Sequence, residues 1–232
     1  MNIGVLGTGM VGQSIAGKLA QLGHEVTIGT RNVAATAGET KPNPMGMPPF
    51  SAWHTANANV RLGTFAEAAA FGEILFNCTN GGGSLEALTQ AGDLRLSGKI
   101  LVDIANPLDF SKGMPPTLSV SNADSLGEKI QRAFPNLKVV KALNTMNAML
   151  MTNPAVLNDG DHTLFVCGND AAAKQRVADL LGTFGWRKEN VLDLGDITNA
   201  RGVEMILPLW IRLYGIFQSP MFQFKIVRPA QP

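Results

Sequence analysis

The sequence GTGMVG at residues 7–12 places the strongest constraint on the fold, because it fits the GxGxxG pattern at a particular kind of junction. The apolar run NIGVL at 2–6 precedes it, and from about residue 10 to residue 22 apolar residues recur at helical spacing. A glycine-rich turn between a buried strand and an amphipathic helix is typical of a dinucleotide-binding unit. Since the chain has 25 glycines, the context carries more weight than the match. The residues of this loop are Gly7, Thr8, Gly9, Met10, Val11 and Gly12.

Each glycine of the loop has a separate expected role. Gly7 permits the tight turn, Gly9 lets a pyrophosphate approach the backbone, and Gly12 lets the helix pack closely on the strand. The phosphates would meet the free N–H groups at the helix N-terminus. We therefore predict a bound dinucleotide here; the alternative is a glycine-rich turn with no ligand.

Strands and helices alternate along the rest of the chain. Bounded apolar runs predict strands at 25–29, 58–62, 73–78, 99–104, 138–143, 162–168 and 190–194. Helices are predicted at 84–91 and 171–184, after the capping patterns Thr64-x-x-Glu67 and Ser121-x-x-Asp124, and from about residue 199. This order predicts an α/β protein with a Rossmann-type doubly wound, mostly parallel sheet, helices on both faces and a small C-terminal helical extension.

The end of the predicted second strand indicates which dinucleotide binds. A carboxylate there would accept hydrogen bonds from both ribose hydroxyls of NAD and would repel a 2′-phosphate. Thr30 and Asn32 can donate hydrogen bonds instead, and Arg31 offers a planar cationic fork suited to phosphate oxygens. We therefore predict NADP(H) as the cofactor; a solvated turn that contains an arginine is the alternative.

Three further strand-end loops, at 78–84, 103–107 and 141–148, are rich in small and amide residues. Ligands of open α/β sheets bind at the carboxyl ends of the strands, so these loops would cradle ribose and nicotinamide and leave room for a second flat ring. The alternative is that they contain ordinary turn formers. We expect the ammonium of Lys141 to reach outward to the strand end, or to touch a ligand. The candidate residues are Cys78, Thr79, Asn80, Gly81, Ala105, Asn106, Pro107, Asn144 and Thr145.

Composition and charge argue against other classes of protein. The formal net charge of +1 does not favour nucleic acid or a membrane surface as partner. The apolar segment at 205–217 is too short to span a bilayer. The apolar N-terminus does not fit an export signal, because the chain has no basic residue before Lys18. Cys78 and Cys167 are far apart, which predicts free buried thiols in a reducing cytoplasm and no metal site. We expect a cytoplasmic protein whose partner is a small molecule.

Residues 41–58 interrupt the alternation, because they contain four prolines and no periodicity. They form either a surface insertion or a lid. The lid hypothesis depends on Met45, Met47, Phe50 and Trp53, which are unusually apolar for an exposed loop.

The sequence offers no acid or base that we can assign as catalytic. Tyr214, the only tyrosine, is followed four residues later by Gln218, so the Tyr-x-x-x-Lys pair of short-chain dehydrogenases is absent. His24, His54 and His162 lie in a turn, in the 41–58 segment and at a strand start away from the crevice.

Taken in order, several segments carry a family resemblance: GVLGTGMVGQSIAGKLAQLGHEVTIGTRN, GKILVDIANPL, FPNLKVVKALNTMNA, VCGNDAAAKQRVADLLGTFGW and LDLGDITNARGVEMILPLWIRLYG. The chain resembles NADPH-dependent reductases grouped with the deazaflavin (coenzyme F-420)-dependent NADP oxidoreductases. It is similar too to the cytoplasmic oxidoreductase domain of the six-transmembrane metalloreductases. The resemblance implies that Thr8, Thr30 and Arg31 contact NADP, and that the last helices cover the nicotinamide side and help form a homodimer. Deazaflavin reductases tend to carry a histidine where Asn144 stands, and a further basic residue after Arg31 where this chain has alanines.

We therefore expect an NADPH-dependent oxidoreductase that transfers hydride between NADP(H) and a flavin-like or deazaflavin (coenzyme F-420) ring. Residues 1–145 would form the NADP-binding Rossmann domain. Residues 146–232 would form a smaller α/β and helical part on the second-cofactor side, with the dimer interface. The alternatives are an NADPH-dependent reductase of a small carbonyl or imine, and a non-catalytic NADP-binding sensor.

Overall fold

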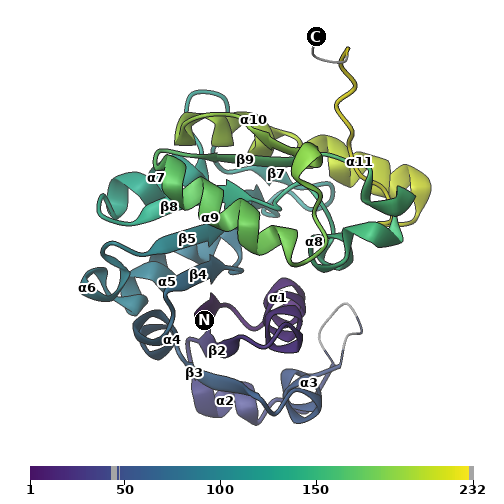
Figure 1. Ribbon diagram of the computed structural model, residues 1–232. Coiled ribbons are helices and arrows are strands. Elements are labelled where there is room, and N and C mark those ends of the chain that lie inside the picture. Colours follow the sequence, from purple (N-terminus) through teal and green to yellow (C-terminus); the bar gives the residue numbers. More distant parts are fainter. Residues whose placement is uncertain (43–45, 47, 230–232) are drawn as a thin grey trace.

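The computed structural model describes residues 1–42, 46 and 48–229, and one eight-stranded sheet forms the centre of that part of the chain (Figure 1). The strands are short runs of β-branched and other apolar residues, which suits a sheet covered on both faces. They are β1 (Asn2–Leu6), β2 (Glu25–Thr30), β3 (Val60–Thr64), β4 (Ile74–Asn77), β5 (Ile100–Asp103), β8 (Lys138–Ala142), β9 (Leu164–Gly168) and β10 (Val191–Asp193).

The strand order is β3-β2-β1-β4-β5-β8-β9-β10. The strands from β3 to β8 are all parallel, β9 runs antiparallel to β8, and β10 is parallel to β9. The chain moves outward from β1 to β3 and then returns to the other side of β1 at β4. The reversal creates a topological switch point between β1 and β4, where doubly wound sheets bind their ligands. The predicted Rossmann-type, mostly parallel sheet is confirmed.

Side chains of successive strand residues enter two separate cores, one on each face of the sheet. Ile3 and Val5 belong to the first core, whereas Leu6 belongs to the second, as the two-residue period of a strand requires. Helices α1 (Met10–Gln21), α3 (Phe50–Ala56), α8 (Ala148–Thr152) and α9 (Ala171–Gly182) contribute to the first core. Helices α4 (Phe65–Phe71), α5 (Ser84–Ala91), α6 (Asp93–Leu96), α7 (Leu126–Ala133) and α10 (Ala200–Met205) contribute to the second.

Two predicted helix starts have different outcomes. The capping box at Thr64 is present: Glu67 N donates to Thr64 Oγ1 at 3.2 Å, and Thr64 N donates to Glu67 Oε2 at 2.7 Å. The predicted start at Ser121 is wrong, because α7 begins at Leu126 with Ser125 as its N-cap. The Asp124 carboxylate is instead paired with Arg132 at 2.7 Å. Ser125-x-x-Glu128 offers the same pattern four residues further along, and the packing of α7 selects it.

The segment 41–58 contains a helix that its lack of periodicity did not predict. Phe50, at the start of α3, is 2% exposed and packs in the first core, with the ring of Trp53 5.4 Å away. Core packing thus accounts for the apolar character of both residues. Met45 and Met47, on which the lid hypothesis then depends, lie outside the described residues.

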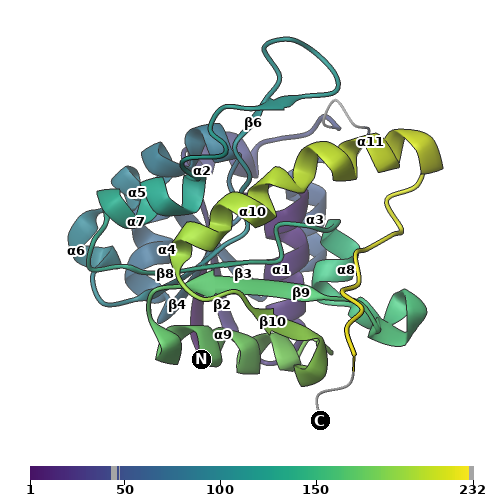
Figure 2. The ribbon, with the colours of Figure 1, turned by 90° about the horizontal axis from the view of Figure 1, so that it is seen from above.

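The last part of the chain crosses the molecule and returns. Helix α10 is followed directly by α11 (Leu207–Phe217), and the two lie nearly in one line in Figure 2. Residues beyond α11 run back as extended chain, where Thr163 N donates to Phe224 O at 2.9 Å and Lys225 pairs with Asp161. The shorter elements include α2 (Val33–Ala37) and the hairpin of β6 (Leu108–Asp109) and β7 (Thr117–Leu118). Within the described ranges, none of the helices is both long and apolar enough to cross a bilayer.

The strands after residue 146 extend the same sheet as those before it. Strand β9 pairs with β8 in the register Val140 to Gly168, so the core is continuous across residue 145. The division into parts 1–145 and 146–232 stays a prediction about function.

Candidate active site

The glycine loop connects β1 to α1 with no room for side chains at two of its glycines. Gly7 has φ +113°, a value that L side chains rarely adopt. A Cβ on Gly12 would lie 1.9 Å from Gly7 O, so only glycine lets α1 start this close to the strand. A Cβ on Gly9, by contrast, would meet nothing within 4 Å. The backbone at Gly9 therefore borders open space, which is where a pyrophosphate would approach it.

The N-terminus of α1 suits an anion. Its N-cap is Gly9, which makes no side-chain capping bond, and the first turn contains no acidic residue. The free N–H groups of a twelve-residue helix with an uncapped start carry partial positive charge toward the switch point. Gln13 Nε2 donates to Thr8 O at 2.9 Å and holds the loop against the helix.

The end of β2 contains an accessible cation. The side chain of Arg31 is 68% exposed, and its nearest carboxylate is Glu86 at 3.8 Å. Thr30 is 8% exposed, and its hydroxyl lies 2.8 Å from Thr36 Oγ1. Asn32 is the N-cap of α2, where its Oδ1 accepts a hydrogen bond from Ala35 N at 2.9 Å. Arg31 is thus the freest of the three to contact a 2′-phosphate.

A cavity of about 390 Å³ lies at the carboxyl ends of β4, β5 and β8. It brings together eight residues predicted from sequence: Val11, Cys78, Thr79, Asn80, Gly81, Ala105, Asn106 and Asn144. Pro107 and Thr145 are buried and do not line it. A Cβ on Gly81 would lie 2.0 Å from Asn106 O, so the turns after β4 and β5 can meet only if residue 81 is glycine.

Seven further residues line this cavity and were not among the predicted ones. They come from the turn after β5, the β6–β7 hairpin, the turn after β8, α8 and α11, and they are all apolar. The family resemblance implied that the last helices cover the nicotinamide side, and the apolar run at 205–217 is the signal that could have indicated the last two residues, Leu207 and Trp210, individually. These residues are Ile104, Leu108, Phe110, Met146, Met151, Leu207 and Trp210.

Two asparagine side chains fix the loops that end β5 and β8. Asn144 Nδ2 donates to Asn106 Oδ1 at 2.9 Å, and Asn106 Nδ2 donates to Asn144 O at 2.9 Å. Asn144 Nδ2 also donates to Val203 O at 3.0 Å, which connects this pair to α10. The reciprocal bonds hold the cavity wall and the C-terminal helices in one arrangement.

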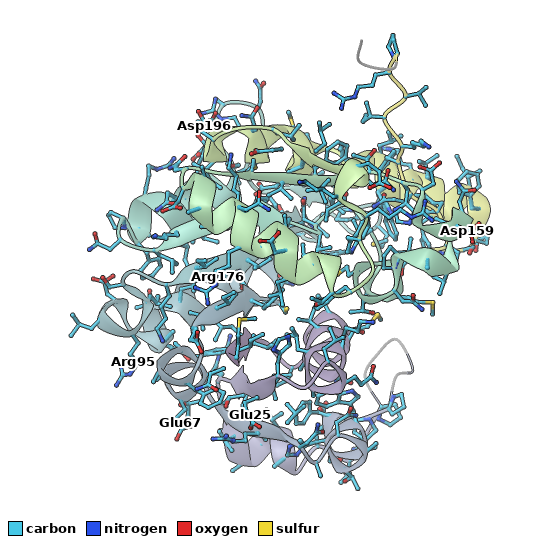
Figure 3. The ribbon with its side chains drawn as sticks, in the orientation of Figure 1. Glu25, Glu67, Arg95, Asp159, Arg176 and Asp196 are labelled. Carbon is cyan, nitrogen blue, oxygen red and sulfur yellow. The ribbon has the colours of Figure 1, made fainter. Side chains whose placement is uncertain are left out.

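The side chain of Lys141 does not point outward as the sequence predicted. Most charged side chains lie on the outside of the molecule, as Figure 3 shows for Glu67, Arg95 and Asp196. The Lys141 side chain is instead 0% exposed, and its Nζ lies 2.9 Å from Asp103 Oδ2 and 2.8 Å from Glu204 Oε1. It also donates to Ala105 O, at the cavity wall. Burial acts to lower the pKa of Lys141, but the two carboxylates together outweigh it and raise that pKa. The ammonium turns inward because these acids, distant in sequence, are packed around it.

The free thiols are not poised for chemistry. Burial, with a further contribution from the Asp103 carboxylate, raises the pKa of the Cys78 thiol well above its usual range. Burial likewise raises the pKa of Cys167 to about 12. Both thiols are therefore protonated near neutral pH, and neither is a nucleophile there.

The histidines lie in structural positions outside the cavity lining. His54 Nε2 lies 2.8 Å from Val60 O, and the buried His162 places Nε2 3.1 Å from Pro154 O. His24 lies in the turn after α1, near the N-terminal amine. None of the three lines the cavity.

A doubly wound sheet with a glycine loop at its switch point and a neutral cavity beside it defines a dinucleotide-dependent oxidoreductase of the Rossmann class. The family model described as NADP oxidoreductase, coenzyme F420-dependent, matches residues 2–107. A solved structure from Arthrobacter sp. FB24, described as a candidate F420-dependent NADP reductase, is 58% identical with a TM-score of 0.94. The match covers 98% of this chain and 100% of that one. The chain belongs to the coenzyme F420-dependent NADP oxidoreductase family.

Two curated relatives cover the chain to different extents. The metalloreductase STEAP3 of Rattus norvegicus is 30% identical over 213 residues, which are 90% of this chain and 37% of the relative. The chain thus spans less than two fifths of that protein's length. The F420-dependent NADP reductase of Methanocaldococcus jannaschii is 36% identical over 122 residues, 51% of this chain and 52% of that protein.

Proposed function

We propose that the chain transfers hydride between NADP(H) and a flat flavin-like or deazaflavin ring of the coenzyme F420 type. One observation carries this proposal: the cavity at the strand ends is lined by small, amide and apolar side chains. Among its lining residues, all of them in the described part of the chain, there is no carboxylate, histidine, lysine, arginine or tyrosine. Such a wall suits a flat, largely apolar ring system.

The neutral wall favours ring-to-ring transfer over carbonyl reduction. A carbonyl acceptor must gain a proton as its oxygen becomes an alkoxide, which calls for a nearby acid. The only thiol in the wall, Cys78, has a pKa raised by burial and is a poor donor near neutral pH. A flavin-type ring delocalises the charge and can take its proton from solvent, so orientation is the main requirement.

The residues present fit NADP(H). The backbone at Gly9 and the N-terminus of α1 would hold the pyrophosphate, and Arg31 would contact the 2′-phosphate. The turns at Thr79–Gly81 and Ala105–Asn106 would then orient the nicotinamide at the cavity. When bound, the cofactor supplies the hydride; the chain's residues bind it, orient it and keep water from the rings.

The names of the relatives support a deazaflavin as the acceptor. The proteins from Methanocaldococcus jannaschii and Arthrobacter sp. FB24 are described as F420-dependent NADP reductases, the latter as a candidate. Against that, Asn144 stands where deazaflavin reductases tend to carry a histidine, and here it is committed to Asn106 and Val203.

The test is NADPH consumption with coenzyme F420, with FMN or riboflavin, and with a panel of small carbonyls and imines. We expect turnover with a deazaflavin or flavin. Changing His24, His54 or His162 singly to alanine should lower it no more than about tenfold, below the loss typical of a general acid. Turnover with carbonyls or imines alone, or one inactive but folded histidine variant, would favour carbonyl reduction. Binding of NADPH without turnover on any acceptor would favour a sensor.

We also propose a symmetric homodimer with α11 in its interface. Helix α11 buries only Leu207, while Leu209 is 52% exposed, Ile216 72% and Phe217 55%. An apolar face of this extent is rarely left in water by a small monomer. Light scattering at micromolar concentration should give twice the chain mass, and changing Ile216 to glutamate should reduce it to one chain mass. A monomer for the unmodified protein would contradict the proposal.

A further inference from the structure

A buried chain of charges lies directly behind the cavity wall. Lys141 stands between Asp103 and Glu204, and all three side chains are at most 2% exposed. The three Lys141 donors are directed to Asp103, Glu204 and Ala105 O. The three elements that bring these groups together are β5, β8 and α10.

Both carboxylates are surrounded by donors only. Asp103 Oδ1 accepts from Asn77 Nδ2 at 2.8 Å and Ala105 N at 3.3 Å, and Oδ2 faces Lys141. Glu204 Oε1 accepts from Gly127 N at 3.0 Å as well as facing Lys141, and Oε2 accepts from Leu126 N at 2.8 Å. A protonated carboxyl would need an acceptor for its hydrogen, and all the hydrogen-bond partners of these two carboxylates are donors. Two ionised acids and one ammonium leave the cluster with one net negative charge.

The cluster reaches the cavity through hydrogen bonds to its wall. Ala105, which lines the cavity, donates to Asp103 through its N–H and accepts from Lys141 through its carbonyl. Asn77, bound to Asp103, accepts from Thr79 Oγ1 at 2.6 Å, and Thr79 lines the cavity too. The Asp103 charge also helps to raise the pKa of the Cys78 thiol in the same wall, after the larger effect of burial. The electrostatic field of the Asp103 carboxylate therefore extends into the cavity.

We infer that the Asp103–Lys141–Glu204 cluster tunes the nicotinamide electrostatically, favouring its oxidised, cationic form over its neutral reduced form. This inference rests on the proposed function, because it requires the nicotinamide at this cavity. Loss of a hydride, with its two electrons, to an acceptor ring leaves one positive charge on the nicotinamide. A net negative charge in a low-dielectric wall stabilises that cation and has little effect on the neutral reduced ring. The three residues act through the wall and do not touch the cofactor, so they are positioning residues.

The test compares the dissociation constants of NADP⁺ and NADPH, measured separately by calorimetry. Changing Glu204 to glutamine, or Asp103 to asparagine, removes the net charge with little change of shape. Each should weaken NADP⁺ relative to NADPH by about five- to thirtyfold, as one unit charge about 8–17 Å away implies at an effective dielectric constant near 20. Changing Glu128 to glutamine is the matched control. Glu128 is also buried and paired, with Arg201 at 2.6 Å, but it bonds to no cavity-lining residue, so the ratio should change less than twofold.

The possible outcomes separate this inference from the proposed function. An unchanged ratio in a folded Glu204 or Asp103 variant that still binds both nucleotides overturns the inference alone. Failure of the unmodified protein to bind either nucleotide overturns the proposed function, and the inference with it. If neither variant folds, the test is made on the unmodified protein, which should bind NADP⁺ at least as tightly as NADPH. Tenfold tighter binding of NADPH to that protein would overturn the inference.

Discussion

Arg31 and Lys141 are two cations at the carboxyl edge of the same sheet, and they differ in almost every physical respect. Arg31 is 68% exposed, with one carboxylate 3.8 Å away. Lys141 is fully buried, and each of its donors already has a partner. An exposed guanidinium with few hydrogen-bond partners can bind a phosphate at little cost in free energy. A buried ammonium cannot, because it would have to break its ion pairs with the buried carboxylates. Position at a strand end therefore does not by itself predict a ligand contact, whereas exposed and weakly paired donors predict one.

The largest expected effect is on the buried cation. Changing Lys141 to methionine leaves Asp103 and Glu204 facing each other without their cation, which should lower the free energy of unfolding by about 3–5 kcal/mol. Changing Arg31 to methionine should alter it by no more than about 0.5 kcal/mol, as is usual for exposed sites. Urea denaturation of both variants makes the comparison. A loss below about 1 kcal/mol for the Lys141 variant would show that the cluster is not tightly coupled.

The exposed cation should matter for cofactor choice. We expect NADPH to bind more tightly than NADH by about 1.5–3 kcal/mol, the scale of a charge-assisted hydrogen bond. Changing Arg31 to alanine should remove most of that difference and leave NADH binding little changed. Arg61 is a suitable control, since it is 60% exposed and paired with Glu25 at 3.3 Å on the neighbouring strand. Equal affinity for both nucleotides in the unmodified protein would refute the assignment of Arg31.

The smallest effect separates two glycines of the same loop. Changing Gly12 to alanine places a methyl group 1.9 Å from Gly7 O, and such overpacking should cost about 1–3 kcal/mol of stability. Changing Gly9 to alanine meets no atom within 4 Å, so stability should be kept while NADPH binds more weakly. Thermal unfolding with and without NADPH distinguishes the two. If the Gly9 variant gains as much thermal stability from NADPH as the unmodified protein does, the open space at Gly9 is not a ligand site.

Much of the candidate site could be read from the sequence because it depends on local chemistry. Glycine in a tight turn, small residues after a strand and a missing acid after β2 are each visible within a few residues. Eight of the predicted residues do line one cavity. The residues that were missed, such as Phe110 and Trp210, lie in a hairpin and in α11, whose approach to the cavity depends on how distant elements pack. The sequence around an apolar residue does not show whether that residue lines a ligand cavity or a protein interface.

The sequence by itself determined the alternation of the main strands and helices, the glycine loop and the cation after β2. These follow from periodicity and from backbone sterics, which operate over a few residues. Only the tertiary structure decided that β9 turns antiparallel to β8, that α7 begins at Leu126, and that Lys141 points inward. Each of these depends on which distant groups meet. Lys141 is the sharpest case, because its buried position is stable only when Asp103 and Glu204 are brought to it from other elements of the fold.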